Sequence, residues 1–407
     1  DSAAADPHAF WVEEAQKLSW KSPWKQVLDD SEAPIYRWFV GGKLNVTESC
    51  LDRHVETTPD RIAFHWEGEP GDSKSLTYAQ LLAEVCRTSN ALKELGVTKG
   101  DTVAIYMGMV PEIIVAMLAC ARIGAAHSVV FGGFSAESLR ERIDDASCTA
   151  VITQDGSWRR GHVVDLKKNV DDSLVGQQTV KHVLVLKRCE NEVDWHQGRD
   201  HWWHDLVPQQ SDQCDAEEMD AEDLLYILYT SGTTGRSKGA MLSQRNLLSN
   251  AETLVDVWQF TKADVLLHAL PIFHTHGLFV ATNIMLLSGG AMVFLPKLDI
   301  DQLIRFMPQA TALMGVPTFY TRLLGSDDFT AGLTAHMRLF ISGSAPLLAE
   351  THKQFEERTG HRILERYGMT ETNMNTSNPY DGPRRGGTVG TPLPGVELKI
   401  CDPDTGE

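Results

Sequence analysis

A run of small hydroxyl-bearing residues and glycines stands between Tyr229 and Gly239, in the sequence YTSGTTGRSKG. Glycines let backbone N–H groups approach an anion closely, and hydroxyl groups can bond to phosphate oxygens. A Walker A loop ends in Gly-Lys-Ser/Thr, whereas Ser237 precedes Lys238 here and a glycine follows it. The segment could cradle phosphate, but not in the manner of a Walker A loop.

Three further segments of the second half carry residue types that could bind a nucleotide or an acid. They are PIFHTHG at 271–277, FISGSAP at 340–346 and ERYGMTE at 365–371. With the loop at 229–239, and in this order, they resemble the signature motifs of the adenylate-forming superfamily of acyl-CoA synthetases, luciferases and peptide-synthetase adenylation domains. Four such motifs together are far more specific than one glycine loop.

The resemblance implies a two-step reaction that uses ATP. A carboxylate is joined to the α-phosphate with release of pyrophosphate, and the thiol of coenzyme A then displaces AMP. The ATP-binding residues that it implies are Thr230, Ser231, Gly232, Thr233, Thr234, Gly235, Lys238, Gly343, Ser344, Ala345, Pro346, Glu365, Arg366, Tyr367, Gly368, Met369 and Thr370. It implies catalytic roles for Lys238, Thr370, Glu371 and His274, with Glu371 as the ligand of Mg²⁺.

The resemblance divides along the chain. Up to about residue 213 it is to acetyl-CoA synthetase, through segments such as WFVGGKLNV and HSVVFGGFSAESLRERI. From about residue 221 to 407 it is to malonyl-CoA synthetase, through HALPIFHTHGLFVATN and ERYGMTETNMNTSNPYDG. Acetyl-CoA synthetases carry a tryptophan-rich stretch before their threonine–glutamate pair, and this chain has RYGM there instead. The chain is therefore a mosaic, whether natural or engineered.

A dicarboxylic acid needs a cation for its far carboxylate, because burial of an unpaired charge is costly. The resemblance to malonyl-CoA synthetases implies Arg322 and Arg366 for this role, with His274 and His276 at the acid site. We therefore expect malonate or methylmalonate as the favoured acid. Taken alone, Arg322 would more simply be a surface arginine of a helix. An acetyl- or propionyl-CoA synthetase is the alternative.

For coenzyme A, the resemblance to acetyl-CoA synthetase points to Arg159 and Arg160 in WRRG, and a solvated basic turn is the plain alternative. His274 and His276 could form a metal pair, but no third ligand is spaced to complete a site. Adenylate-forming enzymes continue into a barrel, a hinge and a small domain with a catalytic lysine, and the sequence stops at Glu407 before them. A nucleotide-binding fragment without turnover is thus a further alternative.

The composition is that of an ordinary globular protein, with 407 residues, 42% hydrophobic and 23% charged. The net charge of −18 argues against a nucleic-acid or anionic-membrane partner and leaves the small molecules ATP, coenzyme A and a carboxylic acid. The most apolar run, at 113–131, is broken by Arg122 and His127, so we expect no membrane span. The seven cysteines contain no C-x-x-C pair and suit reduced thiols, in the cytoplasm or, if a leader was removed, in an organelle matrix. The oligomeric state stays open.

Alternating short strands and helices must position these residues. TVAIYM, HSVVFG and AVITQ predict buried strands, with helices beginning near Pro111 and Ser135 between them. An apolar face and a Thr77–Gln80 capping box predict a helix over 78–95. The second half repeats the alternation from LLYILYT to RILERYG. This pattern predicts an α/β fold of two stacked, doubly wound, mainly parallel sheets.

The composition and patterning of the sequence lead to four expectations about its domains. We expect an N-terminal arm at 1–50, an adenylation large domain of two α/β subdomains at 51–380, and the beginning of a β-barrel subdomain at 381–407. The small mobile C-terminal domain is absent from the sequence. The polar segment 189–223 is interpreted as a surface connection, and the glycine loop is expected to lead directly into a helix capped by Ser243.

Overall fold

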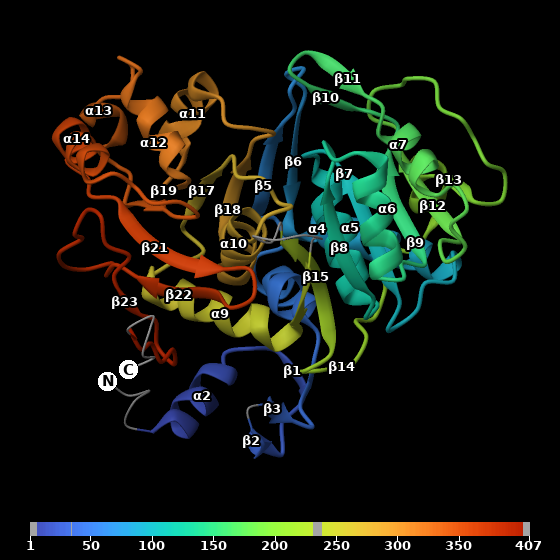
Figure 1. Cartoon of the computed structure of the whole chain (residues 1–407), viewed down its shortest axis with the longest axis horizontal. Coiled ribbons are helices and arrows are strands. Elements are labelled where there is room, and N and C mark those ends of the chain that lie inside the picture. Colours follow the sequence, from blue (N-terminus) through green and yellow to red (C-terminus); the bar gives the residue numbers. More distant parts are fainter. Residues whose placement is uncertain (1–5, 34, 231–237, 402–407) are drawn as a thin grey trace.

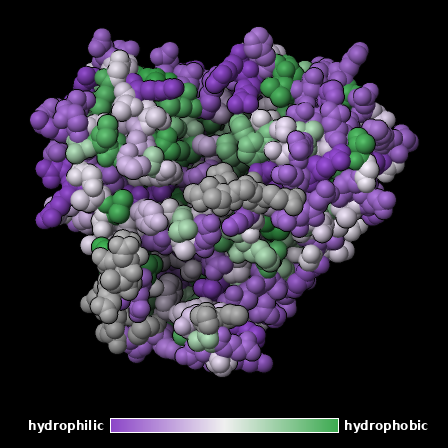
Figure 2. Space-filling model, in the orientation of Figure 1, coloured by the Kyte–Doolittle hydropathy of each residue, from purple (hydrophilic) through white to green (hydrophobic). Residues whose placement is uncertain are grey.

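Two large sheets and the helices around them form the body of the protein. Figure 1 shows the computed structural model, which describes residues 6–33, 35–230 and 238–401. Helices lie between the two sheets and also cover the outer face of each sheet (Figure 1). Figure 2 shows that this side of the molecule is hydrophilic over most of its area, with hydrophobic patches bordering a hollow near its centre.

The first large sheet has seven described strands, in the spatial order β13-β12-β9-β7-β8-β15-β16. All neighbours are parallel except β15 and β16, which form an antiparallel hairpin at one edge. The strands are β7 (Thr102–Met107), β8 (Ala126–Phe131), β9 (Ala150–Gln154), β12 (His182–Leu186), β13 (Asp200–Trp202), β15 (Leu224–Thr230) and β16 (Lys238–Ser243).

The second large sheet has nine described strands, in the order β23-β22-β21-β20-β19-β17-β18-β5-β6. The strands from β21 to β5 in this order are parallel, and β22, β23 and β6 are added antiparallel at the two edges. The strands are β5 (Ile62–Glu67), β6 (Ser73–Thr77), β17 (Val265–His268), β18 (Ala291–Phe294), β19 (Ala312–Gly315), β20 (Leu339–Ser342), β21 (Leu364–Met369), β22 (Asn373–Ser377) and β23 (Thr391–Pro392). The predicted fold class, with two mainly parallel sheets, is confirmed.

The helices sort into three layers (Figure 1). Helices α6 and α7 cover the outer face of the first sheet, α4, α5, α9 and α10 lie between the sheets, and α11 to α14 cover the second sheet. The α-helices are α2 (Pro7–Ala15), α3 (Arg53–Thr57), α4 (Tyr78–Glu94), α5 (Pro111–Arg122), α6 (Ala136–Asp145), α7 (Leu166–Ser173), α8 (Trp203–Leu206), α9 (Gln244–Val257), α10 (Asn283–Ser288), α11 (Ile300–Phe306), α12 (Pro317–Leu324), α13 (Ala331–Thr334) and α14 (Ala349–Thr359). Short π or 3-10 turns are η1 (Glu48–Asp52), η2 (Val207–Gln209), η3 (His276–Thr282) and η4 (Met307–Gln309).

Alternation along the strands explains how both faces of the first sheet are buried. In β7, Ala104 and Tyr106 join the hydrophobic cluster under α6 and α7, whereas Val103 and Ile105 join the large cluster that extends between the sheets. Successive side chains of a strand point to opposite faces, so a continuous apolar run is what a doubly covered sheet needs. The helix predicted over 78–95 is α4, and its capping box is present.

Small antiparallel sheets complete the described structure. The N-terminal arm contributes β1 (Trp20–Ser22) and β4 (Lys43–Leu44), which form a sheet with β14 (Met219–Asp220). It also contains the hairpin of β2 (Gln26–Glu32) and β3 (Ile35–Val40). A second hairpin, β10 (Ser157–Arg159) with β11 (His162–Val164), follows β9 and carries the WRRG segment.

The structure corrects two local predictions and leaves a third untested. Segment 189–223 is not a plain surface connection, because it contributes β13 and buries Asp200 and Trp203. Strand β16 stands between the glycine loop and the helix capped by Ser243, so the loop does not lead directly into that helix. Within 381–401, the one described strand is β23, which pairs with β22 at the edge of the second sheet, and the beginning of a β-barrel subdomain at 381–407 stays a prediction.

Neither disulfides nor membrane helices contribute to the described structure. All seven cysteines are free thiols, and burial raises the pKa of Cys50 and Cys148 to about 12. Among the described helices, none combines the length and the apolar character needed to cross a bilayer.

Helix α2 of the N-terminal arm packs against α9 through a group of ionisable side chains. Glu252 of α9 is buried at 6% exposure, and Lys17 forms ion pairs with Glu14 and Asp256 beside it. Burial raises the pKa of Glu252 to about 8, and the carboxylates of Glu14 and Asp256 add to this rise. The positive charges of Lys17 and Arg53 oppose it.

The raised pKa of Glu252 predicts how stability depends on pH. The folded protein keeps the Glu252 proton up to about pH 8, whereas the unfolded chain loses it near the ordinary value of 4.5. The folded state therefore binds more protons between these values, so this group makes stability fall as pH rises through that window. We expect the free energy of unfolding, measured with urea, to fall less steeply between about pH 5 and about pH 8 in Glu252→Gln than in the wild type.

The control is Glu357→Gln, which changes an exposed carboxylate of α14. This variant should keep the wild-type pH dependence. The same decline in Glu252→Gln as in the wild type would show that Glu252 is not the group responsible.

Candidate functional site

The motif residues gather where the parallel strands of the second sheet end. The turn 343–346 follows β20, the segment 271–277 follows β17, and residues 365–369 lie in β21 itself. In open α/β sheets, ligands bind in the crevice outside the carboxyl ends of the strands. Three described cavities lie around these loops, with volumes of about 340, 320 and 570 Å³.

The 340 Å³ cavity is lined by the turn after β20 and by β21. One wall of the cavity consists of Gly343, Ser344, Ala345 and Pro346. Ser344 has a φ of 68°, which lies in the left-handed region that few non-glycine residues adopt. Arg366 forms another wall, with Glu365, Tyr367 and Gly368 also lining the cavity. Two of the predicted ATP-binding motifs therefore face a common space.

Arg366 is a buried cation for which the described part of the chain provides no partner. Its side chain is 3% exposed, and its Nε and Nη2 atoms have no hydrogen-bond partner among the described residues. Burial lowers the pKa of Arg366 to about 9, so the guanidinium is still charged at neutral pH. A buried, unpaired charge is costly, and an anion bound in the cavity would remove that cost.

Gly343 makes room for this guanidinium. A Cβ atom at position 343 would lie 2.4 Å from Cζ of Arg366, which is far closer than carbon atoms can approach. Any larger residue at position 343 would therefore have to displace the guanidinium, whereas the backbone of Gly343 has no positive φ that would demand a glycine. This pairing joins the predicted adenine turn to the predicted acid-binding residue.

The segment 274–276 lies beside Arg366. Nδ1 of His276 is 3.3 Å from the hydroxyl of Ser344, and its Nε2 has no described partner. Burial lowers the pKa of His276 well below its ordinary value, and the positive charge of Arg366 adds to this, so the ring is neutral. Partial desolvation and Arg366 also lower the pKa of His274, which is more exposed. Two neutral rings therefore line the space beside a charged arginine.

Thr370 and Glu371 stand at the tip of the β21–β22 hairpin. The hydroxyl of Thr275 donates to the hydroxyl of Thr370 at 3.3 Å, which places Thr370 next to the histidine segment. Glu371 is exposed and makes no hydrogen bond or ion pair with the described residues. An exposed, uncommitted carboxylate suits Mg²⁺, which uses one or two carboxylates together with substrate phosphates.

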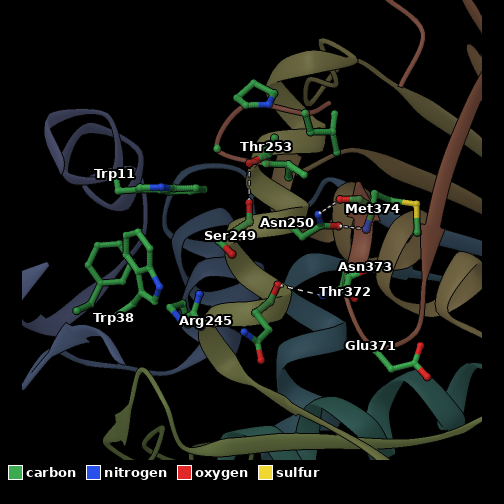
Figure 3. Close-up of a pocket in the computed structure, with 16 residues that line it drawn as sticks. Trp11, Trp38, Arg245, Ser249, Asn250, Thr253, Glu371, Thr372, Asn373 and Met374 are labelled. Carbon is green, nitrogen blue, oxygen red and sulfur yellow. Dashed lines mark hydrogen bonds between the residues drawn. The ribbon is translucent and has the colours of Figure 1, made fainter. Parts of the chain in front are cut away.

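Helix α9 holds this hairpin in place. Figure 3 shows Asn250 bonded to both the N–H and the C=O of Met374, at 3.2 and 3.0 Å, while Asn373 donates to the carbonyl of Asn246 at 3.3 Å. These residues line the 320 Å³ cavity with Trp11 and Trp38, and the carboxylate of Glu371 points away from both tryptophans (Figure 3). The asparagines were not predicted, because nothing local in the sequence reveals their long-range partners.

The 570 Å³ cavity has a basic wall, which we define as Arg159, Arg160, Arg188, Lys297 and Arg322. The guanidinium of Arg159 lies 5.0 Å from the ring centre of Phe131. The predicted coenzyme A residues, Arg159 and Arg160, are thus placed in a cavity large enough for a ligand. Arg188 and Lys297 were missed, because each is an isolated cation in the sequence.

Arg322 and Arg366 are not brought together. Arg322 is exposed on α12 and lines the 570 Å³ cavity, whereas Arg366 lines the 340 Å³ cavity. Tyr320 of the same helix is fully buried and donates to the carbonyl of Ile341. Positions two apart on a helix face roughly opposite sides. The two arginines therefore line different cavities, and their joint binding of the far carboxylate stays a prediction.

The glycine loop itself can be placed only by its ends. Ser231, Gly232, Thr233, Thr234 and Gly235 lie outside the described residues. Thr230 at the end of β15 pairs with Lys238 at the start of β16. Met369 and Tyr367 are exposed on β21. Among the described residues, no group of three or more His, Cys, Asp or Glu side chains is arranged to hold a metal ion.

Comparisons with known proteins agree with the motifs. The profile of the AMP-binding enzyme family matches residues 51–407, and that of the acetyl-coenzyme A synthetase N-terminus matches residues 1–50. The chain is 40% identical to acetyl-coenzyme A synthetase of Mycolicibacterium smegmatis over 98% of this chain and 44% of that protein. It is 40% identical to the Escherichia coli enzyme of the same name over 97% of this chain and 61% of that protein.

A solved structure gives a similar result. ATP-bound MatB from Rhodopseudomonas palustris is 44% identical, with a TM-score of 0.77 over 89% of this chain and 68% of that chain. The matched part of the chain spans 44% of the length of the first curated relative and 65% of the length of the second.

The packing of Gly343 against Arg366 predicts a specific defect. In Gly343→Ala the new methyl group must displace the guanidinium, so we expect affinity for ATP, measured by titration calorimetry, to fall by about tenfold or more. Gly332→Ala is the matched control, because its Cβ would meet only Thr330 Oγ1 at 3.9 Å. Equal ATP affinity in the two variants would contradict the role given to this contact.

Proposed function

Because the chain belongs to the AMP-binding enzyme family, we propose that it forms the nucleotide- and acid-binding part of an acyl-CoA synthetase. In this proposal ATP activates a short-chain carboxylate as an acyl adenylate, pyrophosphate leaves, and coenzyme A takes the acyl group. The observation that carries the proposal is the buried Arg366 between the turn 343–346 and the segment 274–276, because its Nε and Nη2 atoms have no partner among the residues that the structure describes.

Each part of the site would then hold one part of the reactants. The turn 343–346 would receive the adenine, and Thr370 would donate its hydroxyl to an α-phosphate oxygen. Lys238, which is exposed at the start of β16, would neutralise the outer phosphates. Glu371 would hold Mg²⁺, which supplies positive charge for the phosphates when bound.

The neutral histidine segment supports acid binding. His276 is fully enclosed and uncharged, so it can donate or accept a hydrogen bond without repelling Arg366 electrostatically. Exclusion of water by the buried residues strengthens the attraction between Arg366 and a carboxylate. Together these residues would orient the acid for attack on the α-phosphate, which is a gain from positioning.

The identity of the acid has two candidates. The names of the curated relatives favour acetate, the alternative of the sequence analysis, over the malonate that was expected first. One observation favours a dicarboxylate such as malonate, since Arg366 offers unpaired N–H groups that a methyl group could not satisfy. We therefore propose a short-chain acid with acetate as the first candidate and malonate as the second.

The 570 Å³ cavity would receive coenzyme A. Arg159 and Arg160 would bind its phosphates, with Arg188, Lys297 and Arg322 adding positive charge. The whole chain carries a net charge of −18, so a local group of five cations is a marked departure from the average surface. Support for this assignment comes from the cavity that Arg159 and Arg160 line, and from the resemblance of this segment to acetyl-CoA synthetase, which implies the two arginines for the nucleotide phosphate of coenzyme A.

The choice between the two acids can be tested at Arg366. Replacing an unpaired buried cation with an apolar side chain of similar length should not destabilise the unliganded protein, so Arg366→Met should melt at or above the wild-type temperature. If malonate is bound through Arg366, the ratio of malonate to acetate affinity in the presence of ATP should fall by about tenfold or more.

Arg322→Met is the matched control, because Arg322 lines the other cavity. It should change that ratio by less than about threefold. A preference for acetate in the wild type that is unchanged in Arg366→Met would remove malonate as a candidate. The measurement is thermal stabilisation by each acid at saturating ATP.

Lys238 provides a test of the phosphate loop. We expect Lys238→Ala to lower the affinity for ATP by about tenfold and to change the affinity for AMP by less than about twofold, because AMP lacks the outer phosphates. Lys262→Ala, at an exposed lysine after α9, should change neither affinity. Equal loss for ATP and AMP in Lys238→Ala would mean that Lys238 does not act on the β- and γ-phosphates. Both affinities can be measured by titration calorimetry.

A further inference from the structure

The turn between β5 and β6, residues 68–72, brings two carboxylates to the basic wall of the 570 Å³ cavity. Its sequence is GEPGD, and it belongs to the edge of the second sheet. Figure 1 shows β5 and β6 reaching the same end of the molecule as the β10–β11 hairpin. Glu69 of this turn is the one carboxylate among the described residues that line the cavity.

Glu69 connects two loops that carry cations. Its Oε1 accepts the backbone N–H of Gly161 at 2.7 Å, and its Oε2 lies 3.2 Å from Nζ of Lys297. Gly161 follows Arg159 and Arg160 in the tight turn of the β10–β11 hairpin, where Arg160 has a φ of 53° and Gly161 a φ of 79°. The side chain of Glu69 is only 13% exposed, whereas its bond to Gly161 lies at the surface and the side chain of Lys297 is 42% exposed.

Asp72 makes a parallel contact at the other end of the turn. Its Oδ1 lies 2.9 Å from Nη2 of Arg188, whose guanidinium also packs 5.2 Å from the ring centre of Trp66. Gly68 has no room for a side chain, since its Cβ would lie 2.2 Å from Oδ1 of Asp72 and 2.7 Å from Nη2 of Arg188. The turn is therefore packed directly against the loop after β12.

These contacts join loops from both sheets. The hairpin with Arg159 and Arg160 follows β9 of the first sheet, and the loop with Lys297 follows β18 of the second sheet. Carboxylates in a site for an anion are unfavourable by charge alone, because they repel the anion. The contacts of these carboxylates explain their presence, because they hold the hairpin in place before the ligand binds. A flexible hairpin would have to be ordered during binding, and this ordering would lower the affinity.

We propose that the β5–β6 turn positions the basic wall, and that Glu69 is the positioning residue that holds the β10–β11 hairpin through Gly161. The ligand class is a polyphosphorylated cofactor of the coenzyme A type, and this part rests on the proposed function. Glu69 lines the same cavity, but the role assigned to it is to act through the two arginines and not as a contact of the ligand. It acts by fixing the direction in which Arg159 and Arg160 face the cavity.

Two substitutions separate positioning from charge. Glu69→Ala removes both contacts, whereas Glu69→Gln keeps an oxygen that can accept the Gly161 N–H and removes only the negative charge. If charge alone mattered, both variants would bind an anion more tightly than the wild type. Positioning predicts that Glu69→Ala binds coenzyme A about fivefold more weakly, while Glu69→Gln binds it as tightly as the wild type or more tightly.

The experiment combines titration with coenzyme A and hydrogen exchange of the hairpin in the unliganded chain. In Glu69→Ala, the peptide covering residues 157–164 should exchange about tenfold faster than in the wild type, and in Glu69→Gln it should change less than about threefold. Asp72→Ala is the control in the same turn, because it releases Arg188 and leaves the Gly161 contact intact. It should leave exchange of the hairpin peptide unchanged.

The outcomes are distinguishable. Unchanged hairpin exchange in Glu69→Ala, or coenzyme A binding as tight as in the wild type, would overturn the positioning role. If the wild type does not bind coenzyme A, the ligand assigned under the proposed function is wrong, and the exchange measurement still decides whether Glu69 holds the hairpin. Faster exchange with weaker coenzyme A binding in Glu69→Ala alone is the expected result.

Discussion

Arg366 is a charged group in a place where a charge is costly. It is 3% exposed, and two of its nitrogens have no partner among the described residues. Neighbouring residues fit this arginine: Gly343 leaves room for the guanidinium, and the histidines beside it are neutral because burial and its charge lower their pKa values. The cost of the unpaired cation is the physical reason to expect an anionic ligand here.

The scaffold explains how distant residues reach this arginine. Arg366 lies on β21, the turn 343–346 follows the adjacent strand β20, and the segment 271–277 follows β17 in the same sheet. Helix α9 fixes the β21–β22 hairpin through Asn250, so Thr370 and Glu371 are held relative to the rest. The 570 Å³ cavity uses loops of both sheets, which is where two α/β layers can enclose a larger ligand.

Most of what could be predicted came from patterns among residues that are close together in the chain. These patterns are the Thr77–Gln80 capping box, the alternation of strands and helices, and the four motifs. The structure confirms the capping box and the alternation, and the described residues of three motifs lie beside one sheet. Contacts between distant residues could not be predicted, such as Asn250 with Met374, 124 positions apart, and Glu69 with Gly161, 92 apart. The separation of Arg322 from Arg366 also depends on the rotation of a helix that the sequence does not specify.

A crystal structure of the chain with ATP and a short-chain acid would show directly whether Arg366 binds an anion. We predict that the adenine lies against residues 343–346 and that an anionic oxygen of the acid or the nucleotide lies within about 3 Å of the guanidinium of Arg366. ATP bound elsewhere, with Arg366 still unpaired in a closed and empty cavity, would contradict it.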